Sequence, residues 1–160
     1  MTSDANDGGE FSYDESVIGK EIEAGTYEIT LERIQAYCES LGETNELYTD
    51  EEAAKAGPYG GIIAPPGILF TGAFGQAPDA KIVFGNTTFM AGQRFELSEP
   101  IRPGDTITAH AQVKEVFEKT GRSGRMVFSV TRTRYTNQHG RDVAANEQSQ
   151  VYRQVTPRTD

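Results

Sequence analysis

The spacing of apolar residues changes near Lys81, from a helical period to strict alternation. Upstream, apolar residues recur every three or four positions after Thr30, a residue type that often caps helix N-termini. These positions are Leu31, Ile34, Tyr37, Cys38 and Leu41. Gly42 follows them, where the end of a helix favours a positive φ angle. The pattern predicts an amphipathic helix between Thr30 and Gly42.

Two further helices are predicted before the alternation begins. Residues 49–52, Thr-Asp-Glu-Glu, have the form of a capping box with Thr49 as N-cap, and Gly57 ends that helix. An apolar run that starts with a proline pair predicts a largely buried helix over residues 66–74. The loop from Glu43 to Tyr48 lies between the first two helices, a place suited to a site that needs rigid positioning.

Strands dominate the second half of the chain. Residues 106–117 alternate, with Ile107, Ala109, Ala111 and Val113 on one face and polar residues on the other. Glycine-containing turns at 121–124 and 137–140 separate this strand from residues 126–136 and 143–153, and residues 87–97 form a fourth strand. Helices followed by antiparallel strands give an α+β class, and the apolar helix that follows Pro65 is the expected cover for the sheet. A curved antiparallel sheet wrapped round one central helix is the hotdog fold.

Length and composition indicate one domain with an acidic tail. A chain of 160 residues is long enough for a single core, which we place at residues 11–155, and residues 1–10 are expected to be disordered. The net charge of −9 argues against a nucleic-acid or anionic-membrane partner. No run of 18 apolar residues predicts a membrane span, and the N-terminus does not resemble a signal peptide. We therefore expect a cytoplasmic protein.

The segment from Tyr37 to Tyr48 resembles the active-site loop of MaoC-like (R)-specific enoyl-CoA hydratases and hydroxyacyl-thioester dehydratases, which reads Ser-Gly-Asp-x-Asn-Pro-(Ile/Leu)-His. Gly42, Asn45 and Leu47 match this loop. At the aspartate, proline and histidine positions of that loop the chain has Glu43, Glu46 and Tyr48. The fold is therefore expected from the frame of the loop, while both catalytic side chains are replaced.

Further segments extend the resemblance over most of the chain. The N-terminal, FAS1-type dehydratase branch of the family has the most similar sequence pattern. They are residues 59–66, 95–105, 119–125 and 133–140. The resemblance implies a hotdog fold, an acyl thioester of coenzyme A or acyl carrier protein as substrate, and no other cofactor. It also implies hydration or dehydration of that thioester.

The resemblance implies roles for five residues. Glu43 takes the place of the aspartate and is the candidate base, while Tyr48 is at most an orienting or acidic partner, because a phenol is a poor base near neutral pH. Gly67 offers the first backbone N–H after Pro66 and is the candidate donor to the thioester oxygen. Asn45 and Pro66 complete the predicted substrate-binding set, with a structural role favoured for Asn45.

Other residues with reactive or charged side chains receive structural interpretations. Cys38 falls on the apolar helix face and is interpreted as a core residue. His110 in a strand and His139 in a turn are expected to be structural or solvated, and Arg122 and Arg125 are weaker candidates for binding coenzyme A phosphates. Two histidines and one cysteine at these separations give no metal-ligand spacing.

Three functions remain open from the sequence. The chain is a homodimeric hydratase or dehydratase with an altered catalytic pair, or a non-catalytic hotdog subunit that forms the acyl-binding tunnel beside a catalytic MaoC-like chain. A thioesterase is disfavoured, because residues 66–74 contain none of the carboxylates that thioesterases of this fold carry on the central helix. In each case an open sheet edge predicts at least a dimer.

Overall fold

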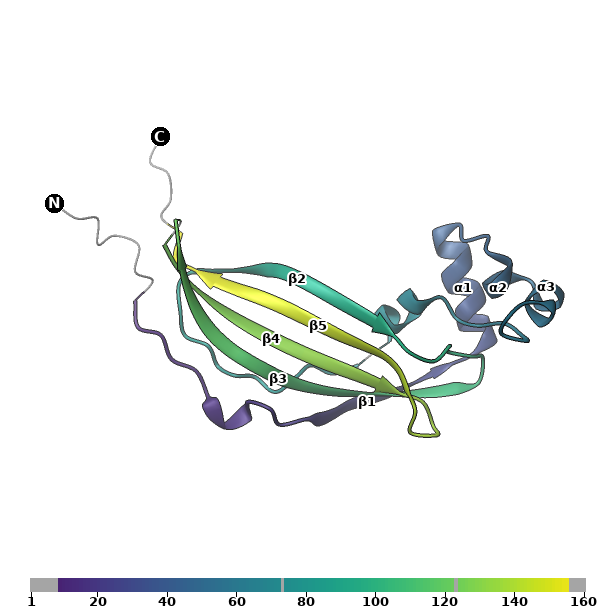
Figure 1. Cartoon of the computed structure of the whole chain (residues 1–160), viewed down its shortest axis with the longest axis horizontal. Helices are drawn as coiled ribbons and strands as arrows, with labels where there is room; N and C mark the ends of the chain where they lie inside the picture. Colours follow the sequence, from purple (N-terminus) through teal and green to yellow (C-terminus); the bar gives the residue numbers. More distant parts are fainter. Residues whose placement is uncertain (1–8, 73, 123, 156–160) are drawn as a thin grey trace.

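The computed structural model describes residues 9–72, 74–122 and 124–155. It contains one antiparallel sheet, with the α-helices gathered beyond one end of it (Figure 1). In chain order the elements are η1 (Glu15–Val17), β1 (Ile22–Ile29), α1 (Leu31–Leu41), α2 (Glu46–Thr49), α3 (Glu51–Ala56), η2 (Pro66–Thr71), β2 (Thr87–Leu97), β3 (Asp105–Gly121), β4 (Gly124–Thr136) and β5 (Asp142–Arg153), where η denotes a 3-10 helix. The predicted α+β class is confirmed. The predicted acidic tail, residues 1–10, lies outside the described residues except for its last two.

The five strands follow the order β1-β3-β4-β5-β2, and every neighbouring pair is antiparallel. Register shifts at Val113/Glu115 in β3 and at Met90/Gly92 in β2 interrupt the ladders, and such bulges bend and twist a sheet. All four predicted strands are confirmed, and β1 adds a fifth. The alternation in β3 holds, because Ile107 and Ala109 are fully buried.

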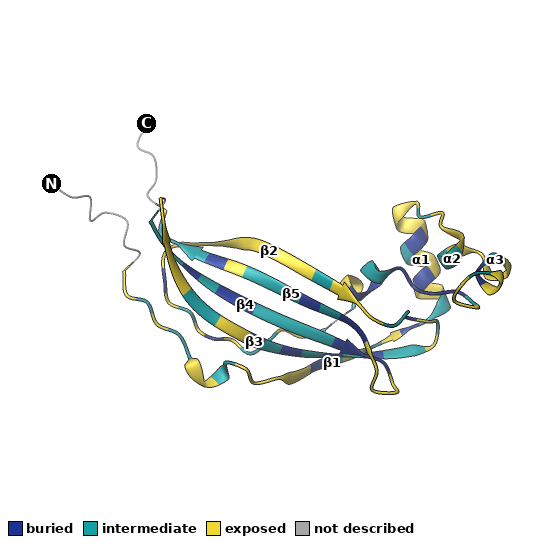
Figure 2. Cartoon of the chain, in the orientation of Figure 1, coloured by how far each residue is buried: buried dark blue, intermediate teal, exposed yellow. Residues whose placement is uncertain are grey.

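The apolar core lies at the end of the sheet nearest the helices. Ile29 of β1, Ile34 of α1, Ile68 of η2 and Ile107 of β3 are at most 1% exposed and belong to one cluster. Burial of each such side chain stabilises the fold by roughly 1.5–3 kcal/mol. Figure 2 shows buried residues on the inner face of α1 and along the strands, whereas β2 is exposed over nearly its whole length.

Local capping signals determine the ends of α1. The Thr30 hydroxyl accepts a hydrogen bond from the Arg33 N–H at 3.2 Å, and Gly42 adopts a left-handed φ of +66°. The Gly42 N–H donates to the carbonyls of Cys38 and Glu39, which closes the last turn. Both predicted boundaries of this helix are confirmed.

The predicted N-cap of the next helix is wrong by one residue. Asp50, not Thr49, caps α3, since its carboxylate accepts from the N–H groups of Glu52 and Ala53, both at 2.9 Å. Thr49 instead ends α2, a single turn formed within the predicted loop, and its hydroxyl donates to the Asn45 carbonyl. Threonine and aspartate are both good caps, so the sequence pattern does not distinguish two adjacent candidates.

The predicted helix over residues 66–74 is a shorter, tighter element. Only the 3-10 helix Pro66–Thr71 forms, and the chain is extended again at Gly72. Gly67, Gly72, Gly75 and Pro78 crowd this segment with the residue types least favourable to an α-helix. From Phe74 onward an irregular segment lies over the sheet.

Within the described residues, no helix has the length and apolar character needed to cross a bilayer.

Replacing Asp50 with Ala should lower the free energy of unfolding by about 1 kcal/mol, because two N–H groups at the start of α3 lose their acceptor. Urea denaturation followed by circular dichroism measures the change. Thr49→Ala is the matched control and should have the smaller effect. A larger loss in Thr49→Ala would contradict the assignment of Asp50 as the cap.

Candidate active site

Backbone N–H groups of the loop between α1 and α2 bind the carboxylate of Glu43, a residue of the same loop. Gly42 turns the chain, and Glu43 Oε1 then accepts hydrogen bonds from the N–H groups of Thr44 and Asn45, both at 2.9 Å. The Glu43 side chain is half-buried. One of its two oxygens is thus already committed to holding the loop.

Asn45 stabilises the start of α2. Its Oδ1 accepts from the Leu47 N–H at 3.0 Å, and the residue itself is exposed. This is the structural role favoured from the sequence. Contact between Asn45 and a substrate stays a prediction.

Tyr48 packs against the apolar core beside Glu43. Burial, together with the negative charge of Glu43, raises the pKa of the Tyr48 phenol above its ordinary value of 10.0. The same two causes raise the pKa of the Cys38 thiol, which is only 2% exposed and belongs to the core as predicted. Tyr48 is therefore protonated at neutral pH, so it can donate a hydrogen bond but cannot accept a proton.

Gly67 lies in the first turn of η2, one residue after Pro66. The Ile68 N–H donates to the Pro65 carbonyl at 3.0 Å, whereas the Gly67 N–H has no backbone acceptor among the described residues. The hydroxyl of Tyr37 packs directly against Gly67, so closely that a Cβ atom at this position would collide with it. This contact brings α1 and η2 together. The sequence pattern placed Tyr37 on the apolar face of the first helix but did not predict its contact with Gly67.

The structure connects these residues through two contacts. Glu43 and Tyr48 interact electrostatically across the loop, and the Ile63 N–H donates to the Leu47 carbonyl at 3.2 Å, which ties the chain before η2 to the same loop. Pro66 is half-buried at the start of η2. The predicted site residues other than Asn45 thus lie on, or are tied to, the packed end of the sheet.

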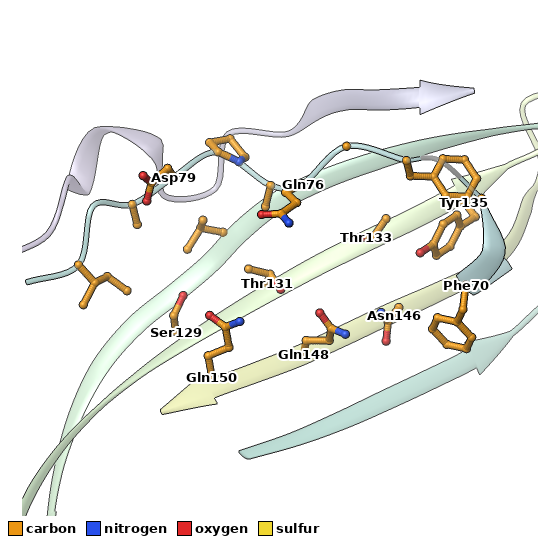
Figure 3. A pocket seen from close by; sticks show the side chains of 18 of the residues that line it. Phe70, Gln76, Asp79, Ser129, Thr131, Thr133, Tyr135, Asn146, Gln148 and Gln150 are labelled. Atoms are coloured by element: carbon orange, nitrogen blue, oxygen red, sulfur yellow. The ribbon is translucent and has the colours of Figure 1, made fainter. Parts of the chain in front are cut away.

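A cavity of about 630 Å³ begins where η2 ends. It lies between the sheet and the irregular segment from Phe74 to Ile82, and side chains from β4, β5 and that segment point into it (Figure 3). Leu69, Phe70 and Tyr135 line it near η2, and Ser129 and Gln150 line it farther out. Glu43, Tyr48 and Gly67 do not line it themselves. Gly67 precedes Leu69 by two residues, about 4 Å along a 3-10 axis.

The sequence matches the family described as "FAS1-like, dehydratase domain region" over residues 16–146. The chain belongs to this family. A UPF0336 protein from Streptomyces avermitilis is 32% identical over 114 residues, which cover 68% of this chain and 76% of that protein.

Solved structures with the hotdog fold superpose on this chain. The MaoC-like dehydratase from Rhodospirillum rubrum superposes with a TM-score of 0.67 at 19% identity, covering 88% of this chain and 94% of that one. One chain of the ChsH1–ChsH2 complex from Mycobacterium tuberculosis gives a TM-score of 0.68 at 18% identity, covering 87% of this chain and 86% of that one. The predicted hotdog fold and MaoC-like relationship are confirmed. The central element of this hotdog, however, is the short η2.

The two histidines of this dehydratase-family chain lie away from the loop. His110 alternates with the core residues Ala109 and Ala111, so it faces the opposite side of the sheet, where its Nε2 lies 3.2 Å from the Thr136 hydroxyl. His139 lies in the turn after β4, beside Gln138. Neither histidine replaces the imidazole that the family's active-site loop carries.

The candidate phosphate-binding arginines lie at the β3–β4 turn. Arg125 donates to the Gly9 carbonyl, pairs with Glu118 at 2.7 Å and lies 5.1 Å from the centre of the Phe84 ring. These contacts give it a structural role at that end of the sheet. Arg122 is exposed, and its contact with coenzyme A stays a prediction.

Substitution of Gly67 by Ala should lower the free energy of unfolding by about 1–3 kcal/mol, because the new methyl group occupies space held by the Tyr37 hydroxyl. Removing that hydroxyl in a Gly67→Ala/Tyr37→Phe double variant should recover most of the loss. Urea unfolding of the single and double variants measures the loss of stability in Gly67→Ala and its recovery in the double variant. Additive losses would show that Gly67 and Tyr37 do not compete for this space.

Alkaline pH should destabilise the protein through Tyr135. Burial raises the pKa of its phenol above 10.0, so above that pH the unfolded chain releases the proton while the folded chain retains it. Stability is full below pH 10 and falls as the pH rises towards the folded-state pKa, by up to about 1.4 kcal/mol per pH unit. Tyr135→Phe should lose less stability than wild type between pH 9 and 11 in urea titrations. An equal loss of stability in wild type and Tyr135→Phe would show that Tyr135 does not cause the alkaline destabilisation.

Proposed function

We propose that this chain is an acyl-thioester-binding subunit of a hydratase or dehydratase, and that a MaoC-like partner chain supplies the catalytic carboxylate and imidazole. The observation that carries the proposal is the state of the loop between α1 and α2. Glu43 Oε1 is held by two backbone N–H groups, and Tyr48 is kept protonated. Both groups of the family's proton-transfer pair are thus replaced in this loop.

Addition of water to an enoyl thioester needs two kinds of group. A base must take a proton from water, and N–H donors must stabilise the negative charge that develops on the thioester oxygen. The Gly67 N–H, which has no backbone acceptor among the described residues, supports the second role in this chain. His110 faces away and Tyr48 cannot accept a proton, so Glu43 is the remaining candidate for the first role near the loop. One of its two carboxylate oxygens is already held by two backbone N–H groups.

The free edge of β2 supports a partner chain. This strand pairs only with β5, so the hydrogen-bonding groups along its other side have no neighbouring strand in the described structure. Phe89, Met90 and Leu97 on this strand are 46%, 59% and 57% exposed. An uncovered apolar edge favours pairing with another chain, and the ChsH1–ChsH2 neighbour is itself a complex. The same edge equally suits a second copy of this chain.

A self-sufficient hydratase is the second candidate, and one observation favours it. Glu43 Oε2 accepts no hydrogen bond from the described residues, and the carboxylate lies close enough to Tyr48 to affect its titration. Glu43 would then be the base and Tyr48 a hydrogen-bond donor. Coenzyme A and acyl carrier protein are both suitable carriers for either candidate.

Hydration of crotonyl-CoA distinguishes the two candidates. We expect the purified chain alone to leave the enoyl-thioester absorbance unchanged, and co-expression with a MaoC-like chain that has an intact Asp-x-Asn-x-x-His loop to give a complex that hydrates the substrate. Glu43→Gln in this chain should leave the activity of that complex within about threefold, because the partner supplies the base.

The control for Glu43→Gln is Glu46→Gln, at an exposed position in the first turn of α2. Hydration by the chain alone that falls by more than about a hundredfold in Glu43→Gln, but not in Glu46→Gln, would establish the self-sufficient hydratase instead.

A further inference from the structure

The cavity after η2 changes character along its length (Figure 3). Its end next to η2 is aromatic, since Phe74 lies 5.4 Å from Tyr135 between ring centres and Phe70 lies nearby. Farther along β4 and β5, alternate residues line the cavity, and six of them are polar and uncharged. These residues are Ser129, Thr131, Thr133, Asn146, Gln148 and Gln150.

Strand register arranges these six side chains as facing pairs. Thr133 is opposite Asn146, Thr131 is opposite Gln148, and the third pair lies one step farther out. Residues two apart on a strand point to the same face, so all six share the face that forms the core nearer the helices. On that same face, Ala109 and Ala144 belong to the apolar core. The inner face therefore turns from apolar to polar where η2 no longer covers it.

Much of the hydrogen-bonding capacity of these residues is unused. Ser129 and Asn146 are only 5% and 7% exposed. Within the described ranges, Asn146 Oδ1 accepts from Gln93 Nε2 at 3.0 Å, whereas the Asn146 amide N–H groups and the hydroxyl of Ser129 have no hydrogen-bond partner in the protein. The side chains of Thr131, Thr133 and Gln148 make no hydrogen bonds there either. These atoms are not among the fully buried side-chain atoms of the described residues that have no partner, so they are reached from the cavity. Water or a ligand in the cavity can therefore satisfy them.

The charge of the cavity restricts the ligand. Asp79 is the only charged residue among the described residues that line it, and its Oδ1 accepts from the Lys81 N–H at 2.8 Å. Phosphates bind where Lys, Arg or clustered N–H groups concentrate positive charge. This wall therefore suits a neutral polar group and not the nucleotide end of coenzyme A.

We infer that the cavity binds an acyl group carrying neutral hydrogen-bonding substituents, hydroxyl or carbonyl, several carbons beyond the thioester. The inference rests on the proposed function for the thioester itself, held near Gly67. The aromatic end would contact the first carbons of the acyl group. The first polar pair lies two residues beyond Tyr135 along β4, roughly 7 Å, and the last about 20 Å.

Two thioesters that differ by one oxygen test this inference on the full chain. Isothermal titration calorimetry compares octanoyl-CoA with 8-hydroxyoctanoyl-CoA. Because a hydrogen bond to a buried polar group contributes about 1 kcal/mol, the hydroxylated thioester should bind at least about fivefold more tightly. A Thr131→Val/Gln148→Leu double variant should abolish or reverse this preference.

Gln112→Leu is the matched control, because Gln112 is a half-buried glutamine that faces the other side of the sheet between Ala111 and Val113. It should keep the wild-type preference. Equal or tighter binding of octanoyl-CoA by wild type would overturn the inference without need of any variant, as would a failure to bind either thioester.

Crotonyl-CoA hydration by the complex with a catalytic partner is measured in parallel. Hydration with no preference for the hydroxylated thioester would leave the proposed function standing and remove the inference. The preference without any hydration would remove the proposed function and leave the inference.

Discussion

The inner face of the sheet is apolar at one end only, and the arrangement of the helices follows from that constraint. Ile107 and Ala109 of β3 must be covered, and α1 and η2 provide the cover through Ile34 and Ile68. The loop that joins α1 to α2 is anchored at this packed end through Cys38 and Tyr48, which contact the core, while Gly42, Thr44 and Asn45 are exposed. The position of the candidate site thus depends on apolar burial more than on any contact made by Glu43 or Tyr48.

Sequence reasoning succeeded where the signal was local. Thr30 and Gly42 determine the ends of α1 through their own side chain or backbone freedom, so the neighbouring residues were sufficient evidence. It failed for the helix over residues 66–74, where a strong apolar pattern was set against glycines whose effect depends on what the rest of the chain packs there. It also placed one cap a residue early, because Thr49 and Asp50 are both favourable N-cap residues.

The polar wall of the cavity was missed for a different reason. In β4 both alternating sets are polar over part of the strand, with Thr131 and Thr133 on one face and Arg132 and Arg134 on the other. Alternation predicts that the two sets separate, but it does not say which set faces inward. The register with β5 and the residues lining the cavity supply that information. The resemblance of the loop was recognisable from the sequence. The hydrogen bonds from the Thr44 and Asn45 N–H groups to Glu43 are visible only in the folded structure.

The uncovered edge of β2 has a consequence for the energetics of the whole protein. Any chain that pairs along this edge binds only the folded state, so by mass action it adds to the apparent stability in proportion to the logarithm of its concentration. The midpoint of thermal unfolding is then a property of the solution as well as of the sequence. Dilution below the dissociation constant of that pairing would leave this marginal 160-residue domain to fold on its own core alone.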